Sequence, residues 1–180
     1  FDIIFANAGI SGGTGGSNEE NLKDIYEQDD TIFAVNLGGV LNTIHPILPQ
    51  MIERHSGQIA IISSLAGYLP LPGAAAYTAS KAAIRYYGQA LGIKLQKDNV
   101  HLSVVCPGFV KSEMTDANHF PMPFLMPTTK AVKIIAKGMA QRKPNISFPA
   151  ALQVAILTLS MLPAPFLEAI LRKFPEKKSL

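Results

Sequence analysis

Tyr77 and Lys81 are the residues whose types and spacing most clearly indicate chemistry. They bound the segment Tyr77-Thr78-Ala79-Ser80-Lys81, and residues four apart share one face of an α-helix. A cation one turn from a phenol favours the phenolate and lowers the phenol pKa from about 10. Such a phenol can exchange protons near neutral pH. Taken alone, the spacing is more often a half-buried ring beside a solvated ammonium.

Two further polar residues precede this pair at positions that support a chemical role. Ser64 lies 13 residues before Tyr77 and follows an apolar run, and Asn36 lies 28 residues before Ser64. A hydroxyl at the end of a strand can hydrogen-bond a substrate oxygen where negative charge develops. The order Asn, Ser, Tyr, Lys therefore predicts a site built from several elements.

Alternating apolar runs and helical patterns predict the scaffold that positions these residues. Strands are predicted at 2–6, 58–63, 100–106 and 146–148. Helical patterns cover about 18–54, 74–97 and 128–141, the last capped by Thr128, and then 150–162 and 166–174. This alternation predicts an α/β fold with a doubly wound parallel sheet and helices on both faces. Its sites lie at the carboxyl ends of the strands.

In this order the features resemble the short-chain dehydrogenase/reductase family. The resemblance is carried by Asn7-Ala8-Gly9, Asn36, Ser64, Tyr77 with Lys81, and Pro107-Gly108-Phe109-Val110-Lys111-Ser112. It covers residue 1 to about residue 115. Two positions depart from the family pattern: the paired Asn before Ala-Gly is here Ala6-Asn7, and Ser112 stands where Thr is more common.

The resemblance implies a single Rossmann-like domain over 1–180 that transfers a hydride between NAD or NADP and a secondary alcohol or ketone. The catalytic residues it implies are Asn36, Ser64, Tyr77 and Lys81. The cofactor-binding residues it implies are Asn7, Ala8, Gly9, Tyr77, Lys81, Pro107, Gly108, Val110 and Ser112. In the family, the lysine also holds the nicotinamide ribose, and the asparagine holds a water that relays protons.

A substrate lid is expected over 113–145, by the same resemblance. Its apolar residues are Phe109, Phe120, Met122, Phe124 and Met126. An apolar lid predicts an apolar substrate, although these side chains could equally pack the segment onto the domain.

The N-terminal part of the sequence does not match the glycine-rich turn that binds the pyrophosphate of a dinucleotide. Gly12, Gly13, Gly15 and Gly16 follow the first strand but match neither the dinucleotide pattern nor a P-loop, so they indicate a flexible loop. In the family about a third of the domain precedes the strand at 2–6, including the turn that binds pyrophosphate. We therefore expect these 180 residues to be part of a domain of roughly 250. Alone, they should bind cofactor weakly and associate through an open sheet edge.

Composition excludes several other classes of protein. With 48% hydrophobic residues, 16% charged residues and a net charge of +3, neither a disordered chain nor a nucleic-acid surface is indicated. The single cysteine, Cys106, ends an apolar strand and is predicted to be buried, which fits a reducing cytoplasmic setting. The four histidines show no metal-ligand spacing, so no metal is predicted.

The C-terminal part, 149–180, combines apolar helices with a basic tail. Its basic residues are Arg172, Lys173, Lys177 and Lys178. The apolar stretch is too short to span a bilayer, which needs about 20 residues. Peripheral contact with an anionic membrane is one alternative, and packing over the substrate cleft or against another subunit is the favoured one. By resemblance, a homodimer or homotetramer is expected through 32–54 and 74–97.

Two alternative functions remain open. A non-catalytic dinucleotide-binding or scaffold protein could keep this fold, but it would have no physical need for Asn36, Ser64, Tyr77 and Lys81 together. An extended-branch epimerase or dehydratase shares the Tyr and Lys chemistry, but such enzymes usually carry a larger C-terminal domain than the 65 residues that follow Thr115 here.

Overall fold

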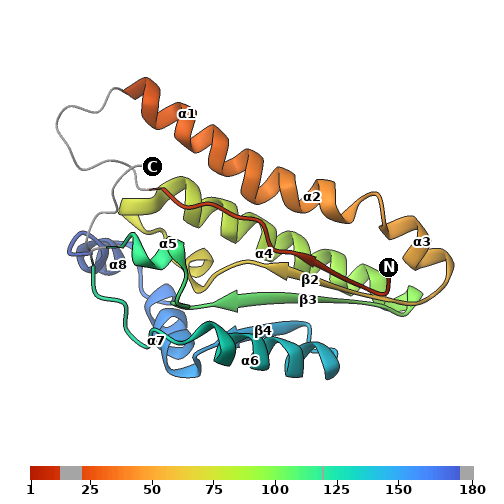
Figure 1. Cartoon of the computed structure of the whole chain (residues 1–180). Helices are drawn as coiled ribbons and strands as arrows, with labels where there is room; N and C mark the ends of the chain where they lie inside the picture. The colour runs from red at the N-terminus through yellow and green to blue at the C-terminus, as the bar shows by residue number, and fades with distance from the viewer. Residues whose placement is uncertain (13–21, 119, 175–180) are drawn as a thin grey trace.

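A computed structural model describes residues 1–12, 22–118 and 120–174 of the chain, and it has a four-stranded parallel sheet at its centre (Figure 1). The strands are β1 (Ile3–Ala6), β2 (Gly57–Ile62), β3 (Val100–Pro107) and β4 (Asn145–Phe148), and they lie in the order β1-β2-β3-β4. The predicted strands and their parallel arrangement are confirmed. The glycine loop was predicted around Gly13 to Gly16, and those residues lie outside the described ranges.

Eight α-helices connect or flank these strands within the described ranges. They are α1 (Leu22–Phe33), α2 (Gly39–Ile44), α3 (Leu48–Glu53), α4 (Ala75–Leu95), α5 (Glu113–Asp116), α6 (Thr128–Ala140), α7 (Ala150–Ser160) and α8 (Ala164–Leu171). Short 3-10 turns occur at Leu65–Tyr68, Pro72–Ala74 and Gln96–Asp98. No helix in the described ranges is long and apolar enough to cross a membrane.

The prediction of one long helix over 18–54 is wrong in its continuity: the described residues are helical over 22–44 and 48–53, with a break between them. A π-helical turn at Ala34–Gly38 separates α1 from α2, and a non-helical turn precedes α3. Pro46 lies in that second turn, where its missing N–H removes a helical hydrogen bond. Asn36 therefore lies on the π-helical turn, and such turns are frequent at functional sites.

Two helix starts also differ from the sequence prediction. Pro127, and not Thr128, is the N-cap of α6, because the Thr128 hydroxyl instead donates to the Lys111 carbonyl at 2.7 Å. Helix α8 begins at Ala164, before the predicted start at Phe166. Pro165 lies in the first turn of that helix, where a missing N–H removes no hydrogen bond.

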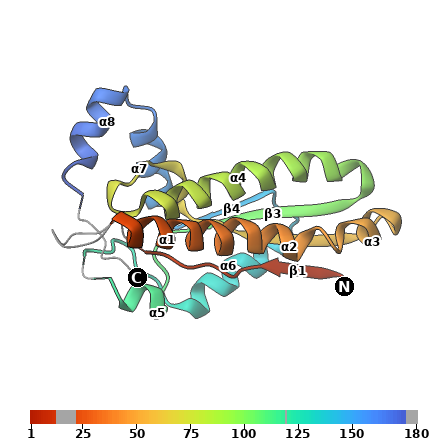
Figure 2. The same cartoon turned by 90° about the horizontal axis from the view of Figure 1, so that it is seen from above.

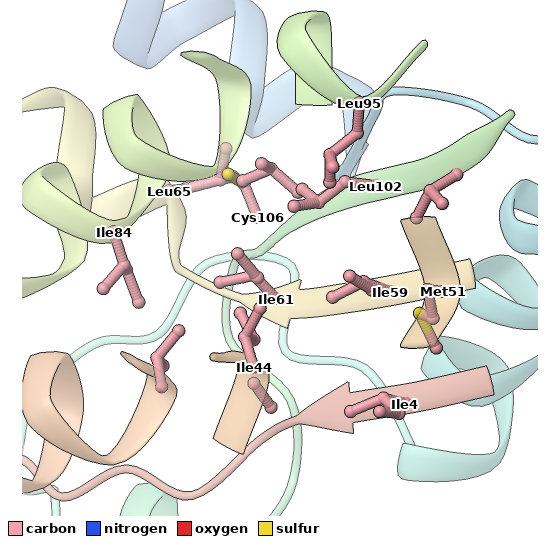
Figure 3. Close-up of a cluster of buried hydrophobic side chains, with 14 residues drawn as sticks. Ile4, Ile44, Met51, Ile59, Ile61, Leu65, Ile84, Leu95, Leu102 and Cys106 are labelled. Atoms are coloured by element: carbon pink, nitrogen blue, oxygen red, sulfur yellow. The ribbon is translucent and has the colours of Figure 1, made fainter. Parts of the chain in front are cut away.

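Apolar clusters pack on both faces of the sheet, which makes it doubly wound. The larger cluster joins Ile4, Ile59, Ile61 and Val104 of the strands to α2, α4 and α7 (Figure 3). The smaller cluster joins Ala60, Val105 and Ile146 to α6 on the other face. Cys106 belongs to the larger cluster, which confirms its prediction as a core residue. Figure 2 shows α4 and α7 on the opposite side of the sheet from α6.

Candidate active site

The predicted polar residues lie at one edge of the sheet, where three neighbouring parallel strands end. Asn7, Ala8 and Gly9 follow β1, Ser63 and Ser64 follow β2, and Pro107 ends β3. Since β1, β2 and β3 are parallel neighbours, these ends must lie side by side. Helix α4 starts beyond the loop that follows β2 and brings Tyr77 and Lys81 to the same edge.

Ser64 is held at the N-terminus of the 3-10 turn Leu65–Tyr68. Its backbone is extended, and its Oγ accepts a hydrogen bond from the Ala66 N–H at 3.1 Å. The same Oγ donates to the Pro107 carbonyl at 3.4 Å, a long and therefore weak bond. The Ser64 hydroxyl is held in place by the bond that it accepts from Ala66. Because its bond to Pro107 is weak, the hydroxyl can rotate and donate its proton to a substrate oxygen instead.

Tyr77 lies half-buried in the first turn of α4. Burial raises its pKa above 10.0, and a hydrogen bond with Ser64 opposes that rise. The phenol is therefore protonated at neutral pH. The predicted net lowering of this pKa is wrong for the described residues, because burial outweighs the stabilisation that Lys81 can give a phenolate from a distance of 5.8 Å between its Nζ and the centre of the Tyr77 ring.

Lys81 is a buried cation, with only 4% of its surface exposed. Its Nζ donates to the Ile62 carbonyl at 3.0 Å, and its own carbonyl accepts from the Ser63 hydroxyl at 2.7 Å. These contacts join α4 to the end of β2. Burial lowers the pKa of the Lys81 ammonium from 10.5 to about 8. At neutral pH it is still mostly charged.

Asn36 is fully buried and holds two distant segments together. Its Oδ1 accepts from the Ile10 N–H at 2.8 Å, while its Nδ2 donates to the Ile10 carbonyl at 2.9 Å and to the Ser80 hydroxyl at 3.0 Å. Both amide N–H bonds are thus used within the protein. Asn36 is a positioning residue in this structure, and the water relay that the resemblance implied for it stays a prediction.

The segment after β3 is fixed by packing and capping as well as by its place at the site. A Cβ added to Gly108 would lie 2.8 Å from Leu152 Cδ2, so the glycine lets α7 approach the strand end. Ser112 is the N-cap of α5, and its Oγ accepts from the Thr115 N–H at 3.4 Å. Val110 forms a parallel bridge with Met126. Cofactor contacts of these residues stay predictions.

Of the five apolar residues predicted for the lid, Met126 faces the core. The Met126 side chain is buried in the smaller cluster, so a substrate-facing role for it is corrected to a packing role. Helix α6, which lies within the predicted range 113–145, packs on the sheet through Ala131 and Met139. Phe109 and Phe120 meet edge to face with ring centres 6.1 Å apart, and Phe124 is exposed.

Comparison with known proteins identifies the family. The model of the family described as short chain dehydrogenase matches residues 1–120. The chain belongs to this family. An uncharacterized oxidoreductase from Myxococcus xanthus is 40% identical over 172 residues, which cover 96% of this chain and 66% of that protein. The 3-oxoacyl-acyl-carrier-protein reductase of Staphylococcus aureus is 35% identical over 117 residues, 64% of this chain and 45% of that protein.

Solved structures show the same fold. A short chain dehydrogenase from Burkholderia cenocepacia in complex with NADP has a TM-score of 0.78 at 21% identity, covering 97% of this chain and 70% of that one. A short-chain dehydrogenase from Sphingobium yanoikuyae in complex with NADPH has a TM-score of 0.73 at 17% identity, covering 100% and 68%. The chain spans 66% or less of the length of the curated relatives described above.

Sequence reasoning selected Ser63 as a residue at the carboxyl end of a strand, but it did not predict the contacts of three groups that support the site. The Ser80 hydroxyl accepts from Asn36 and donates to the Tyr77 carbonyl at 2.8 Å, so it ties the π-helical turn to α4. The Ser63 hydroxyl anchors the backbone of Lys81. The backbone of Ile10 engages Asn36. Ser63 directly precedes Ser64 and Ser80 directly precedes Lys81. A small polar side chain next to a predicted catalytic residue was therefore the signal in the sequence that could have indicated these contacts.

The lowered pKa of Lys81 predicts a pH-dependent contribution to stability. Between pH 8 and about 10.5 the folded chain has released this proton, whereas the unfolded chain still binds it. Stability therefore rises with pH across that window, and below it the buried ammonium opposes folding by a constant amount. The free energy of unfolding of wild type, measured relative to Lys81→Met by denaturant titration, should rise by up to about 3 kcal/mol across the window. A difference that stays flat from pH 7 to pH 10 would contradict the burial of this charge.

Proposed function

We propose that the chain provides the proton-transfer and substrate-binding part of an oxidoreductase that uses NAD or NADP to interconvert a ketone and a secondary alcohol. The observation that carries the proposal is the meeting of Ser64, Tyr77 and Lys81 at one edge of the sheet, where the Lys81 Nζ lies 5.8 Å from the centre of the Tyr77 ring. Family membership and the NADP- and NADPH-bound neighbours support it.

Tyr77 acts as the general acid in carbonyl reduction. The reaction adds a hydride to the carbonyl carbon and a proton to the carbonyl oxygen, and the bound nicotinamide supplies the hydride. Because burial raises the pKa of Tyr77, the phenol holds its proton at neutral pH and can donate it to the oxygen. This is the protonation state that a general acid for ketone reduction requires.

Ser64 acts on the substrate oxygen that accepts this proton, and Lys81 acts on the Tyr77 oxygen that donates it. The Ser64 Oγ–H exchanges its weak bond to Pro107 for a bond to the substrate oxygen, and it stabilises the negative charge that develops there. The Lys81 ammonium stabilises the phenolate that Tyr77 becomes after donating its proton. The Ser63 hydroxyl and the Ile62 carbonyl keep Lys81 in place for this role.

The residues around Lys81 fit the ribose of a nicotinamide cofactor. A Cβ added at Gly9 would lie 3.0 Å from Lys81 Nζ and 3.3 Å from Asn36 Oδ1, so the backbone at Gly9 leaves room only because the side chain is absent. Among the described residues, Lys81 Nζ has one hydrogen-bond acceptor, Ile62, and can donate to ribose hydroxyls. Asn7, Ala8, Pro107, Val110 and Ser112 complete the proposed cofactor set.

A scaffold protein would not need this arrangement. Burying the Lys81 ammonium without a carboxylate partner among the described residues opposes folding, and a protein that only binds or scaffolds has no reason to retain it. The buried cation thus favours the enzyme over the non-catalytic alternative.

The proposed substrate is apolar, because Phe109, Phe120, Met122 and Phe124 lie in the segment that follows β3 at the site edge. The test is nicotinamide absorbance followed with a series of ketones of increasing chain length and the intact enzyme. Each added methylene that the lid buries should raise kcat/KM by a few-fold, corresponding to about 0.8 kcal/mol. Turnover confined to small polar carbonyls would overturn the apolar substrate, and no carbonyl turnover with cofactor bound would overturn the function.

The proposed assembly is a homo-oligomer in the cytoplasm. Helix α4 exposes an apolar stripe formed by Ala79, Ala83, Tyr86 and Ala90, and its small side chains permit close packing against a second helix.

The single cysteine, Cys106, is buried, and burial raises the pKa of its thiol, which fits a reducing compartment.

A further inference from the structure

Arg85 is a second buried cation on α4, and the proposed reaction does not use it. Only 8% of its surface is exposed. Within the described ranges, none of the ion pairs includes Arg85. A buried charge without a carboxylate partner opposes folding unless other groups stabilise it. The surroundings of Arg85 therefore need an explanation.

Two tyrosine rings and one carbonyl stabilise the Arg85 guanidinium. Its carbon Cζ lies 4.0 Å from the centre of the Tyr68 ring and 4.2 Å from the centre of the Tyr86 ring. Both distances are within the about 6 Å over which the face of an aromatic ring attracts a cation. The Arg85 Nε also donates to the Gly67 carbonyl at 3.4 Å, a long bond. Tyr68 and Gly67 both belong to the 3-10 turn Leu65–Tyr68, so two of the three contacts join α4 to that turn.

The Leu65–Tyr68 turn determines how Ser64 is held. The Ser64 Oγ accepts from the Ala66 N–H at 3.1 Å, and the Ser64 carbonyl accepts from the Gly67 N–H at 3.1 Å. Both donors lie in the turn. A movement of the turn relative to α4 would therefore also move the Ser64 hydroxyl.

The turn contacts α4 at two places that are one helical turn apart. A Cβ added at Gly67 would lie 2.8 Å from the carbonyl carbon of Lys81, so the two backbones touch there. Arg85 lies four residues after Lys81 on the same helix face and holds Tyr68, the last residue of the turn. Leu65 is buried in the larger cluster and anchors the start of the turn (Figure 3). Arg85 thus fixes the end of the turn that the core does not.

We propose that Arg85 is a positioning residue that holds the Leu65–Tyr68 turn against α4 and so keeps the Ser64 hydroxyl in place for the substrate oxygen. The inference rests on the proposed function, in which Ser64 stabilises the charge that develops on that oxygen. Arg85 itself touches no reacting group in this role. Because Ser64 acts mainly in the transition state, loss of Arg85 should lower kcat and leave KM almost unchanged.

Ketone reduction by the intact enzyme tests this role in a double-mutant cycle with Ser64. Arg85→Met keeps an unbranched apolar side chain and removes the guanidinium, so kcat should fall about tenfold while KM stays within about twofold of wild type. Ser64→Ala should lower kcat about a hundredfold. In a protein that already carries Ser64→Ala, adding Arg85→Met should lower kcat by less than about twofold, because the group that Arg85 positions is gone.

Two tyrosine variants provide a matched control. Tyr68→Leu and Tyr86→Leu each remove one ring that contacts Arg85, but of the two residues only Tyr68 belongs to the turn. Tyr68→Leu should lower kcat about fivefold, whereas Tyr86→Leu should keep kcat within about twofold of wild type. Arg85→Lys keeps the charge and loses the planar guanidinium, so it should lower kcat as Arg85→Met does.

Amide hydrogen exchange measures the hold on the turn independently of activity. The N–H groups of Ala66, Gly67 and Leu69 are hydrogen-bonded within this segment. In Arg85→Met, peptides that cover residues 65–69 should exchange about tenfold faster than in wild type, with the unfolding temperature unchanged. Exchange at the wild-type rate would overturn the proposal.

The kinetic outcomes separate the other roles that Arg85 could have. A tenfold loss of kcat that persists beside Ser64→Ala, or wild-type kcat in Arg85→Lys, overturns the proposal, because Arg85 would then act independently of Ser64 or through its charge alone. A raised KM for the ketone with unchanged kcat assigns Arg85 to substrate binding and also overturns it. If wild type reduces no ketone, or if Ser64→Ala keeps wild-type kcat, the proposed function fails, and the exchange rates still decide whether Arg85 holds the turn.

Discussion

Replacing Tyr77 with phenylalanine should lower kcat for ketone reduction by about a thousandfold. The variant keeps the ring and loses only the hydroxyl, which is the proposed proton donor. Burial keeps the phenol protonated at neutral pH, and phenylalanine has no exchangeable proton with which to replace it. Cofactor affinity should change little, since Lys81 and the Gly9 backbone remain. Steady-state kinetics and cofactor titration measure the two effects separately.

The same helix provides the control for this substitution. Tyr86 is exposed on α4, away from the carboxyl ends of the strands, so Tyr86→Phe should keep wild-type kcat. Both variants should unfold at the wild-type temperature. If Tyr77→Phe retained more than about a tenth of wild-type kcat, Tyr77 would not be the general acid.

Replacing Asn36 with alanine should destabilise the protein by about 3 kcal/mol. The substitution removes three hydrogen bonds and leaves the partly buried N–H and C=O of Ile10 without their partner. It should also raise the KM for the cofactor, because Ile10 directly follows the Asn7-Ala8-Gly9 segment. Denaturant unfolding measures the first effect and steady-state kinetics the second.

Ser80→Ala is the graded control for Asn36. It removes one of the three bonds of Asn36 and leaves both contacts with Ile10, so it should cost about 1 kcal/mol and leave the KM for the cofactor near wild type. Equal losses of stability in the two variants would mean that the contacts with Ile10 contribute nothing.

The sequence predicts the elements and the identity of the polar residues better than it predicts their contacts. Order and spacing were enough to predict that Ser64, Tyr77 and Lys81 share a site, because parallel strands must end at the same edge. The partners of Asn36 were not predictable, since Ile10 lies 26 residues and Ser80 lies 44 residues away along the chain. Only tertiary packing brings them together.

Two errors have specific physical causes. Apolar periodicity over 32–51 was interpreted as one regular helix, although the five-residue step from Val35 to Val40 is the interval that a π-helical turn produces. Spacing places the Lys81 and Tyr77 backbones one turn apart, but it does not reveal that the Lys81 ammonium turns to the Ile62 carbonyl or that burial controls the phenol pKa.

Met126 shows a third limit of sequence reasoning. An apolar residue in a loop beside a site can face either the substrate or the core, and its type does not distinguish the two. The backbone contacts of Met126 with Phe109 and Lys111 draw this residue against the sheet, where its side chain is buried.

In the proposed reaction, the nicotinamide gives a hydride and Tyr77 gives a proton to a carbonyl. The most direct test is a reaction of the intact enzyme with a ketone and a nicotinamide cofactor deuterated at the transferable position, followed by mass spectrometry of the product. We predict one deuterium on the carbinol carbon of the alcohol with wild type, and formation of that product slowed about a thousandfold with Tyr77→Phe. Tight cofactor binding without deuterium transfer to any ketone would contradict the claim.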